Sequence, residues 1–195
     1  MMENVHLKLL GSKISGAKTY EMSIGSYRGM IFESSNDVEA ALRWLTTVQN
    51  KYGSHRRQKG MVVGMSLDGP EEGQFTSITL FVGKYGISMS MEGGLPMAMK
   101  RFLQKRDGIF FSGYHLLEKR DRLEKQTEIT IPNVLELKQG AVELRALVPG
   151  LKGSSCGVVP DIPVDASEED RAKYYFLAAF QAFMIGKKKM KEIVD

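Results

Sequence analysis

The spacing of hydrophobic residues changes from a period of two to a helical period within the N-terminal third of the chain. Residues 20–24 alternate between apolar and polar side chains, as in a half-buried strand, and the apolar run 30–32 predicts a second strand. From Val38, apolar residues recur every three or four positions, which predicts an amphipathic helix. Asn36 begins a capping box in front of this helix, and Gly53 predicts its end.

Apolar runs separated by glycine and proline predict the remaining elements. The runs 75–82 and 85–91 are joined by Gly83 and Lys84, which predicts a β-hairpin. The charged stretch 118–125 is compatible with either a helical turn or an exposed loop. Further strands are expected at the N-terminus and at 61–67, 109–111, 128–131, 134–137 and 141–148, and further helices at 96–105 and 167–186.

The order of these elements indicates the fold class. Because strands often follow one another directly, we expect an α+β fold with a mostly antiparallel sheet packed with about three helices. A single domain should cover residues 1–195. Proline and glycine in residues 149–166 predict a long loop, and residues 187–195 predict a basic C-terminal tail.

Composition agrees with a soluble globular domain. Of the 195 residues, 43% are hydrophobic and 26% are charged, which excludes a mainly disordered chain and a polytopic membrane protein. The longest apolar run, 174–185, is shorter than the roughly 20 residues that span a bilayer. The N-terminus lacks the pattern of a secretory signal. Cys156 is the only cysteine, so the chain forms no internal disulfide, which fits a reducing compartment.

The chain carries no motif of strong catalytic specificity. None of the three histidines, His6, His55 and His115, stands beside a plausible nucleophile. Paired metal-ligand spacings and phosphate-binding glycine loops do not occur in the sequence. We therefore predict no catalytic residues, no metal and no cofactor, and a protein that is not an enzyme. An enzyme whose site is assembled from distant residues is kept as an alternative.

Clusters of basic residues are the first candidate for a binding surface. Lysine and arginine total 27 against 23 acidic residues, which gives a net charge of +4 and a pI near 9.1. Such clusters bind the phosphates of nucleic acid or of anionic lipids, although each could also be an ordinary solvated face. The candidate membrane or nucleic-acid contacts are Arg56, Arg57, Lys59, Lys100, Arg101, Lys105, Arg106, Lys187, Lys188, Lys189 and Lys191.

A methionine-rich segment is the second candidate. Met89, Met91, Leu95 and Met97 surround two glycines, and the chain has 12 methionines in all. Methionine forms adaptable apolar surfaces, so these four residues are a candidate loop for self-association or insertion into a bilayer. The alternative is that they fill the core.

Three segments of the chain resemble a known family. Residues 26–67 contain Ser26 to Met30 after a strand, the capped helix from Asp37 to Trp44, then Tyr52, a basic turn with Arg57 and an apolar strand. Residues 137–144 and the helix that opens at residues 169–172 follow in the same order. Together these segments resemble the core of rhabdovirus matrix proteins, especially the vesiculovirus-like ones.

This resemblance implies a structural function. A matrix-type protein would self-associate and bridge the viral ribonucleoprotein, or RNA, to the inner face of an anionic membrane during assembly and budding. It would lie under the virion envelope and in the host cytoplasm as a peripheral membrane protein, with the nucleus as a further location and host factors as further partners. The alternative that we keep open is an RNA-binding or host-interacting viral accessory protein without a membrane role.

Overall fold

The computed structural model describes residues 5–12, 17–34, 38–138 and 165–194, which form one α/β domain around a mixed sheet. The described strands form one eight-stranded sheet in the order β1-β2-β3-β6-β5-β4-β7-β8. They are β1 (Val5–Ser12), β2 (Lys18–Ile24), β3 (Tyr27–Ser34), β4 (Met61–Asp68), β5 (Ser77–Val82), β6 (Tyr85–Ser90), β7 (Ile109–Tyr114) and β8 (Val134–Leu137).

The sheet combines antiparallel and parallel pairs. The meander β1-β2-β3 and the hairpin steps β4-β5-β6 are antiparallel, as expected from strands that follow one another directly. The pairs β3-β6, β4-β7 and β7-β8 are parallel. The prediction of a mostly antiparallel α+β sheet is therefore right in part: the helices between β3 and β4, β6 and β7, and β7 and β8 act as crossovers to parallel strands.

Four helices are described, one more than expected. They are α1 (Val38–Lys59), α2 (Met97–Leu103), α3 (Leu116–Thr127) and α5 (Glu168–Val194). Of the two structures considered for residues 118–125, the helix is present, as α3. Residues 128–131 form no strand: Glu128 takes a left-handed backbone conformation at the end of α3, with φ of 57°, and Ile129 and Ile131 enter the core from the connection to β8. No helix among the described residues is both long enough and apolar enough to cross a membrane.

Two helices run past the glycines that were expected to end them. The first helix continues through Gly53 to Lys59, so the basic connection at 55–60 is mostly helix. The last helix continues through Gly186, so residues 187–194 are helical and do not form a separate tail. The strand expected at 141–148, Cys156 and most of the loop expected at 149–166 lie outside the described residues.

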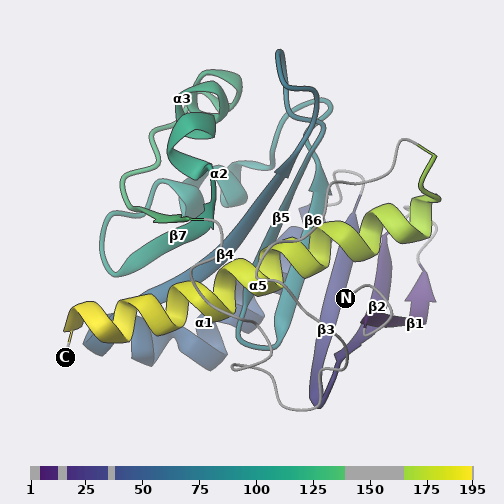
Figure 1. The fold of residues 1–195 in the computed structure, drawn as a ribbon, viewed down its shortest axis with the longest axis horizontal. Helices are drawn as coiled ribbons and strands as arrows, with labels where there is room; N and C mark the ends of the chain where they lie inside the picture. The colour runs from purple at the N-terminus through teal and green to yellow at the C-terminus, as the bar shows by residue number, and fades with distance from the viewer. Residues whose placement is uncertain (1–4, 13–16, 35–37, 139–164, 195) are drawn as a thin grey trace.

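The helices cover opposite faces of the sheet. In Figure 1, α5 runs diagonally across the near face of the sheet, while α1 lies behind it. The far face is packed with α1, α2 and α3 through Trp44, Phe102 and Leu123, which are at most 5% exposed. On the near face, Phe176 and Phe180 of α5 are fully buried.

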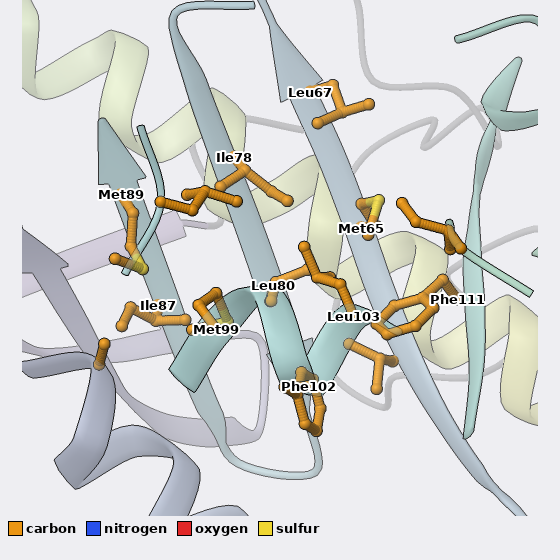
Figure 2. Packing of buried hydrophobic residues seen from close by; sticks show 14 of the residues in the cluster. Met65, Leu67, Ile78, Leu80, Ile87, Met89, Met99, Phe102, Leu103 and Phe111 are labelled. Carbon is orange, nitrogen blue, oxygen red and sulfur yellow. The ribbon is translucent and has the colours of Figure 1, made fainter. Parts of the chain in front are cut away.

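The methionine-rich segment belongs mainly to the core of the far face. Figure 2 shows Met89 beside Ile78 and Ile87, with Met99, Phe102 and Leu103 of α2 directed at the same strands. Met89, Met91 and Leu95 are 1%, 4% and 6% exposed, so the alternative of core packing describes them. Met97, at the start of α2, is 63% exposed.

Candidate functional site at the carboxyl edge of the sheet

Three neighbouring strands, β4, β7 and β8, run parallel, so their carboxyl ends meet at one edge of the sheet. Open α/β sheets bind ligands outside this edge, because the connections that leave it supply side chains and free backbone groups. Charged and polar residues from β4, α3, β8 and α5 gather here. We call this group the carboxyl-edge site: Asp68, Lys119, Arg122, Glu136, Arg171 and Tyr175.

Asp68, the last residue of β4, is held by hydroxyl groups from two other segments. The Tyr175 hydroxyl on α5 donates to Asp68 Oδ2 at 2.7 Å. Thr76 Oγ1 donates to the same oxygen at 3.1 Å. Burial, and then the hydrogen bond to Asp68, raise the pKa of Tyr175 to about 12, so this hydroxyl stays protonated at neutral pH. Asp68 is thereby fixed at the edge in one orientation, with its side chain partly exposed.

Lys119 is the least compensated charge of the site. This side chain of α3 is partly buried, and burial followed by the charge of Arg122 lowers its pKa below the ordinary value for lysine. The carboxylates of Asp68, Glu118 and Glu136 act in the opposite direction but do not offset burial. Within the described part of the chain, Lys119 Nζ has no hydrogen-bond or ion-pair partner. Its three N–H donors are therefore available to a ligand.

Glu136 connects β8 to the beginning of α3. Its Oε2 accepts the backbone N–H of Leu117 at 2.8 Å, and its carbonyl oxygen accepts Lys189 Nζ of α5 at 2.7 Å. A carboxylate is favourable at this position, because the first amides of a helix lack intrahelical acceptors. His115 takes a left-handed backbone conformation, with φ of 52°, and turns the chain from β7 directly into α3. This sharp turn brings Lys119, in the first turns of α3, back over the edge.

The two arginines of the site support neighbouring segments. The guanidinium carbon of Arg122 lies 3.9 Å from the centre of the Phe75 ring, and the group donates to the carbonyl oxygens of Pro70 and Glu71. Arg171 Nε donates to the Ala166 carbonyl oxygen at 3.2 Å, and Arg171 also contacts Tyr175. The contacts of Arg122 fix a second cation beside Lys119, because the carbonyl groups that it binds carry no net charge.

The donor set of this edge does not fit a pair of divalent metal ions. Mg²⁺ takes carboxylate, phosphate and water oxygens in octahedral geometry, and two-metal centres bring two such ions close together. Among residues 5–12, 17–34, 38–138 and 165–194, no three histidine, cysteine or acidic side chains come together as a possible metal site. Asp68 and Glu136 already accept hydrogen bonds, and the Lys119 ammonium lies near both. The described side chains of this edge are thus a lysine, two arginines, a tyrosine hydroxyl and two carboxylates that already accept hydrogen bonds.

The basic residues predicted from the sequence do not belong to this site, except for one backbone contact of Lys189. Lys100, Lys105 and Lys189 are partly buried, and Lys189 is engaged with β8. Arg101, Arg106, Lys187, Lys188 and Lys191 are exposed. Arg56, Arg57 and Lys59 lie in the last turns of α1, and their side chains are outside the described ones.

Sequence reasoning missed the residues of the carboxyl-edge site. In the sequence, acidic residues alternate with the basic residues around Lys119, and Asp68 begins the turn sequence Asp-Gly-Pro. Tyr175 lies within the apolar pattern that predicts the last helix. One signal was available: Asp68 follows the run 61–67, in which Ser66 is the one polar side chain, and such a run is typical of a buried parallel strand that ends at a functional edge.

Comparisons with known proteins give a likeness in structure alone. No family model and no curated protein matches the chain. The EXD2 exonuclease domain from crystals soaked in Mn and GMP is 13% identical over 83% of this chain and 93% of that one, with a TM-score of 0.45. The same domain from crystals soaked in Mn and Mg is 10% identical over 84% of this chain and 93% of that one, with a TM-score of 0.46. The EXO domain of Aedes aegypti Nibbler is 11% identical over 84% of this chain and 89% of that one, with a TM-score of 0.42.

The identification as a rhabdovirus-like matrix protein was wrong, because the chain is similar in fold to the exonuclease domains just described. The predicted roles in virion assembly, membrane bridging and budding were therefore wrong too, and so was the alternative of a viral accessory protein. The same finding overturns the prediction that the chain is not an enzyme. The strings at 26–67, 137–144 and 169–172 misled because they are short and mostly hydrophobic patterns, which many helices and strands packed in a sheet share. At these TM-scores the likeness assigns no role to any residue.

Proposed function

We propose that this chain acts in nucleic-acid processing by holding a phosphodiester strand at the carboxyl-edge site. The observation that carries this proposal is Lys119: a partly buried ammonium group that lacks a direct partner among the described residues and has a lowered pKa. Keeping a charge in such a place costs free energy unless a ligand supplies the missing interactions. A phosphate oxygen supplies them through charge-assisted hydrogen bonds.

The surroundings of Lys119 favour an anion that carries its own hydrogen-bond acceptors. Arg122 adds positive charge beside Lys119, and Tyr175 adds a hydroxyl that remains protonated. Asp68 and Glu136 keep the local charge from becoming strongly positive, so a phosphodiester with one negative charge fits better than a dianion. Neighbouring carboxylates can also accept hydrogen bonds from sugar hydroxyls or from base N–H groups.

The openness of the site favours a polymer. Sites for small molecules enclose most of their ligand, typically about 70–90% of its surface. Asp68, Lys119, Glu136 and Tyr175 are all only partly buried and come from four different elements along an edge. A strand that passes across this edge could contact each of them without being enclosed. The net charge of +4 would further attract a polyanion.

Binding to a labelled single-stranded oligouridine, measured by fluorescence anisotropy, tests the proposal. Removing a charge-assisted hydrogen bond costs about 1.5–3 kcal/mol, so Lys119→Met should weaken binding by about 10- to 150-fold. Lys125→Met is the matched control, because Lys125 is an exposed lysine on the same helix. Equal affinities of the two variants would contradict the proposal.

The pH dependence gives a second readout of the same group. Only the ammonium form of Lys119 binds phosphate, so affinity should fall as pH rises through its lowered pKa, before ordinary lysines lose their charge. The Lys119→Met variant should lack this step and the Lys125→Met variant should keep it. Incubating an end-labelled strand with the protein and Mn²⁺ then separates two kinds of processing. Shortened products that Lys119→Met abolishes assign strand cleavage to this site, whereas intact product restricts the site to holding the strand.

A further inference from the structure

Three basic segments that are far apart in the sequence converge at the opposite edge of the sheet, where β4 and β7 begin. Gly60 links the end of α1 to β4, and a side-chain carbon added there would lie 3.1 Å from the Phe110 ring and 3.7 Å from Met190 Cε. The Met61 amide donates to the Gly108 carbonyl oxygen at 2.7 Å. The last turn of α1, the connection from α2 to β7 and the last turns of α5 therefore meet here.

The described side chains at this meeting point are mainly cationic and open to solvent, with Asp107 and Glu192 as the exposed acids. We call Arg106, Lys187, Lys188 and Lys191, all exposed, the basic end. Lys188 is 4.0 Å from Glu192, whereas Arg106, Lys187 and Lys191 form no ion pair with any described residue. Lys187 and Lys191 are one helical turn apart, so they lie on the same side of α5. In Figure 1 the C-terminal end of α5 lies beside this end of the sheet.

We propose that the basic end is a second contact for the strand held at the carboxyl-edge site. This inference rests on the proposed function and extends it from one phosphate to a tract of strand. The helix α5 joins the two places, because Tyr175 belongs to the carboxyl-edge site and Lys187 to the basic end. At about 1.5 Å per residue these positions are roughly 18 Å apart along the helix. A stacked strand covers that distance with about five nucleotides, at about 3.4 Å each.

The composition of the basic end favours nucleic acid over a membrane surface. Helices that bind membranes bury an apolar face in the bilayer. Phe176, Phe180 and Phe183 of α5 are instead buried against the sheet, and Ile193 is the large apolar side chain exposed near the end of the described helix, at 63%. A surface that offers separate cations and little exposed apolar area suits the phosphates of a polyanion.

The dependence of affinity on strand length tests this second contact. Oligouridines of about 4 nucleotides should reach the carboxyl-edge site alone, whereas those of about 16 should reach both places. The test variant is Lys187→Gln with Lys191→Gln. The control is Lys8→Gln with Lys18→Gln, which removes the same charge from β1 and β2. These strands are separated from β4 and β7 by β3, β6 and β5 in the sheet. Circular dichroism checks that both variants fold.

The test variant should bind the long strand at least ~10-fold more weakly and the short strand unchanged. The slope of log affinity against log salt should fall by about 1.4, since each phosphate contact with a single strand contributes about 0.7. Equal losses for both lengths, losses matched by the control, or no loss would overturn the second contact. Loss of binding to phosphatidylserine vesicles with unchanged strand binding would also overturn it, in favour of a lipid surface. Failure of the proposed function is distinct: Lys119→Met would then leave short-strand binding unchanged.

Discussion

Gly64 offers a direct test of how α5 sits on the sheet. This residue lies in the middle of β4, where α5 crosses it. A Cβ atom added at Gly64 would lie 1.9 Å from the Ala179 carbonyl oxygen, 2.6 Å from the Phe183 amide nitrogen and 2.9 Å from Phe183 Cβ. Two of these neighbours are backbone atoms, so no rotamer change relieves the clash. In a Gly64→Ala variant the helix itself must move.

The size of that movement sets the expected loss of stability. Carbon and oxygen atoms in ordinary contact are about 3.4 Å or more apart, so α5 must retreat by roughly 1.5 Å. A gap of ~1 Å already forfeits up to half of the dispersion energy of the atoms that line it. The rings of Phe176, Phe180 and Phe183 all pack under this part of α5. We expect a loss of about 3 kcal/mol, at the upper end of what overpacking usually costs.

Urea unfolding followed by circular dichroism measures this loss. Gly11→Ala is the control, because a Cβ atom at Gly11 would meet nothing within 4 Å. The control should stay within about 0.5 kcal/mol of the unsubstituted chain, as surface changes do. The urea midpoint of Gly64→Ala should drop with an unchanged m-value. A loss within about 1 kcal/mol of the control would refute the close backbone contact between α5 and β4.

Two further predictions concern polar contacts. Tyr175→Phe removes the 2.7 Å hydrogen bond to Asp68 and should cost about 1 kcal/mol in urea unfolding. The pKa of Tyr175 is raised from 10 in the unfolded chain to about 12 in the folded one, so the stability that this hydroxyl contributes is present below pH 10 and is lost between pH 10 and 12. Over that window the Tyr175→Phe variant should therefore lose less stability than the unsubstituted chain. Identical pH profiles of the two proteins would contradict this prediction. Thr79 and Ser88 share a buried hydrogen bond of 3.0 Å, so Thr79→Val or Ser88→Ala alone should cost about 1–3 kcal/mol of stability in urea unfolding. The double variant should cost less than the sum of the two single variants. Strictly additive losses would show that the two hydroxyls do not interact.

Local patterns were sufficient where neighbouring residues decide the structure. The hairpin of β5 and β6 was predicted from two apolar runs around Gly83, and its register pairs Val82 with Tyr85. The strand β4 and the start of α2 behind Pro96 were predicted for the same kind of reason. Each of these elements has a signal carried by residues close in the sequence, which periodicity and turn chemistry report directly.

The two glycines that were taken for helix ends show where such patterns mislead. A glycine inside a helix costs only about 1 kcal/mol relative to alanine, which packing can outweigh. At Gly186 an added Cβ atom would lie 2.3 Å from Ser112 Oγ, so the missing side chain lets α5 approach β7. Glycine at this position marks a close approach between helix and sheet. A single sequence cannot distinguish that role from a helix end.

The candidate site could not be predicted because its members meet only through long-range topology. Asp68 and Tyr175 are 107 positions apart, and their contact requires α5 to cross the sheet toward the end of β4. In the sequence, acidic neighbours such as Glu118 balance the charge of Lys119. In the fold, burial and the charge of Arg122 outweigh these carboxylates and lower the pKa of Lys119. Parallel pairing of β4 with β7 creates the shared edge, and hydrophobic periodicity carries no information on strand partners.

The late position of α5 in the chain has a consequence during biosynthesis. Every described strand has been made once Leu137 leaves the ribosome, but Phe176, Phe180 and Phe183 follow only after the next 39 to 46 residues. At about 5–20 residues synthesised per second, the face of the sheet that α5 covers stays uncovered for roughly 2–9 seconds. During that interval Met22, Ile31 and Phe81, which are fully buried in the finished fold, remain available to chaperones or to other nascent chains.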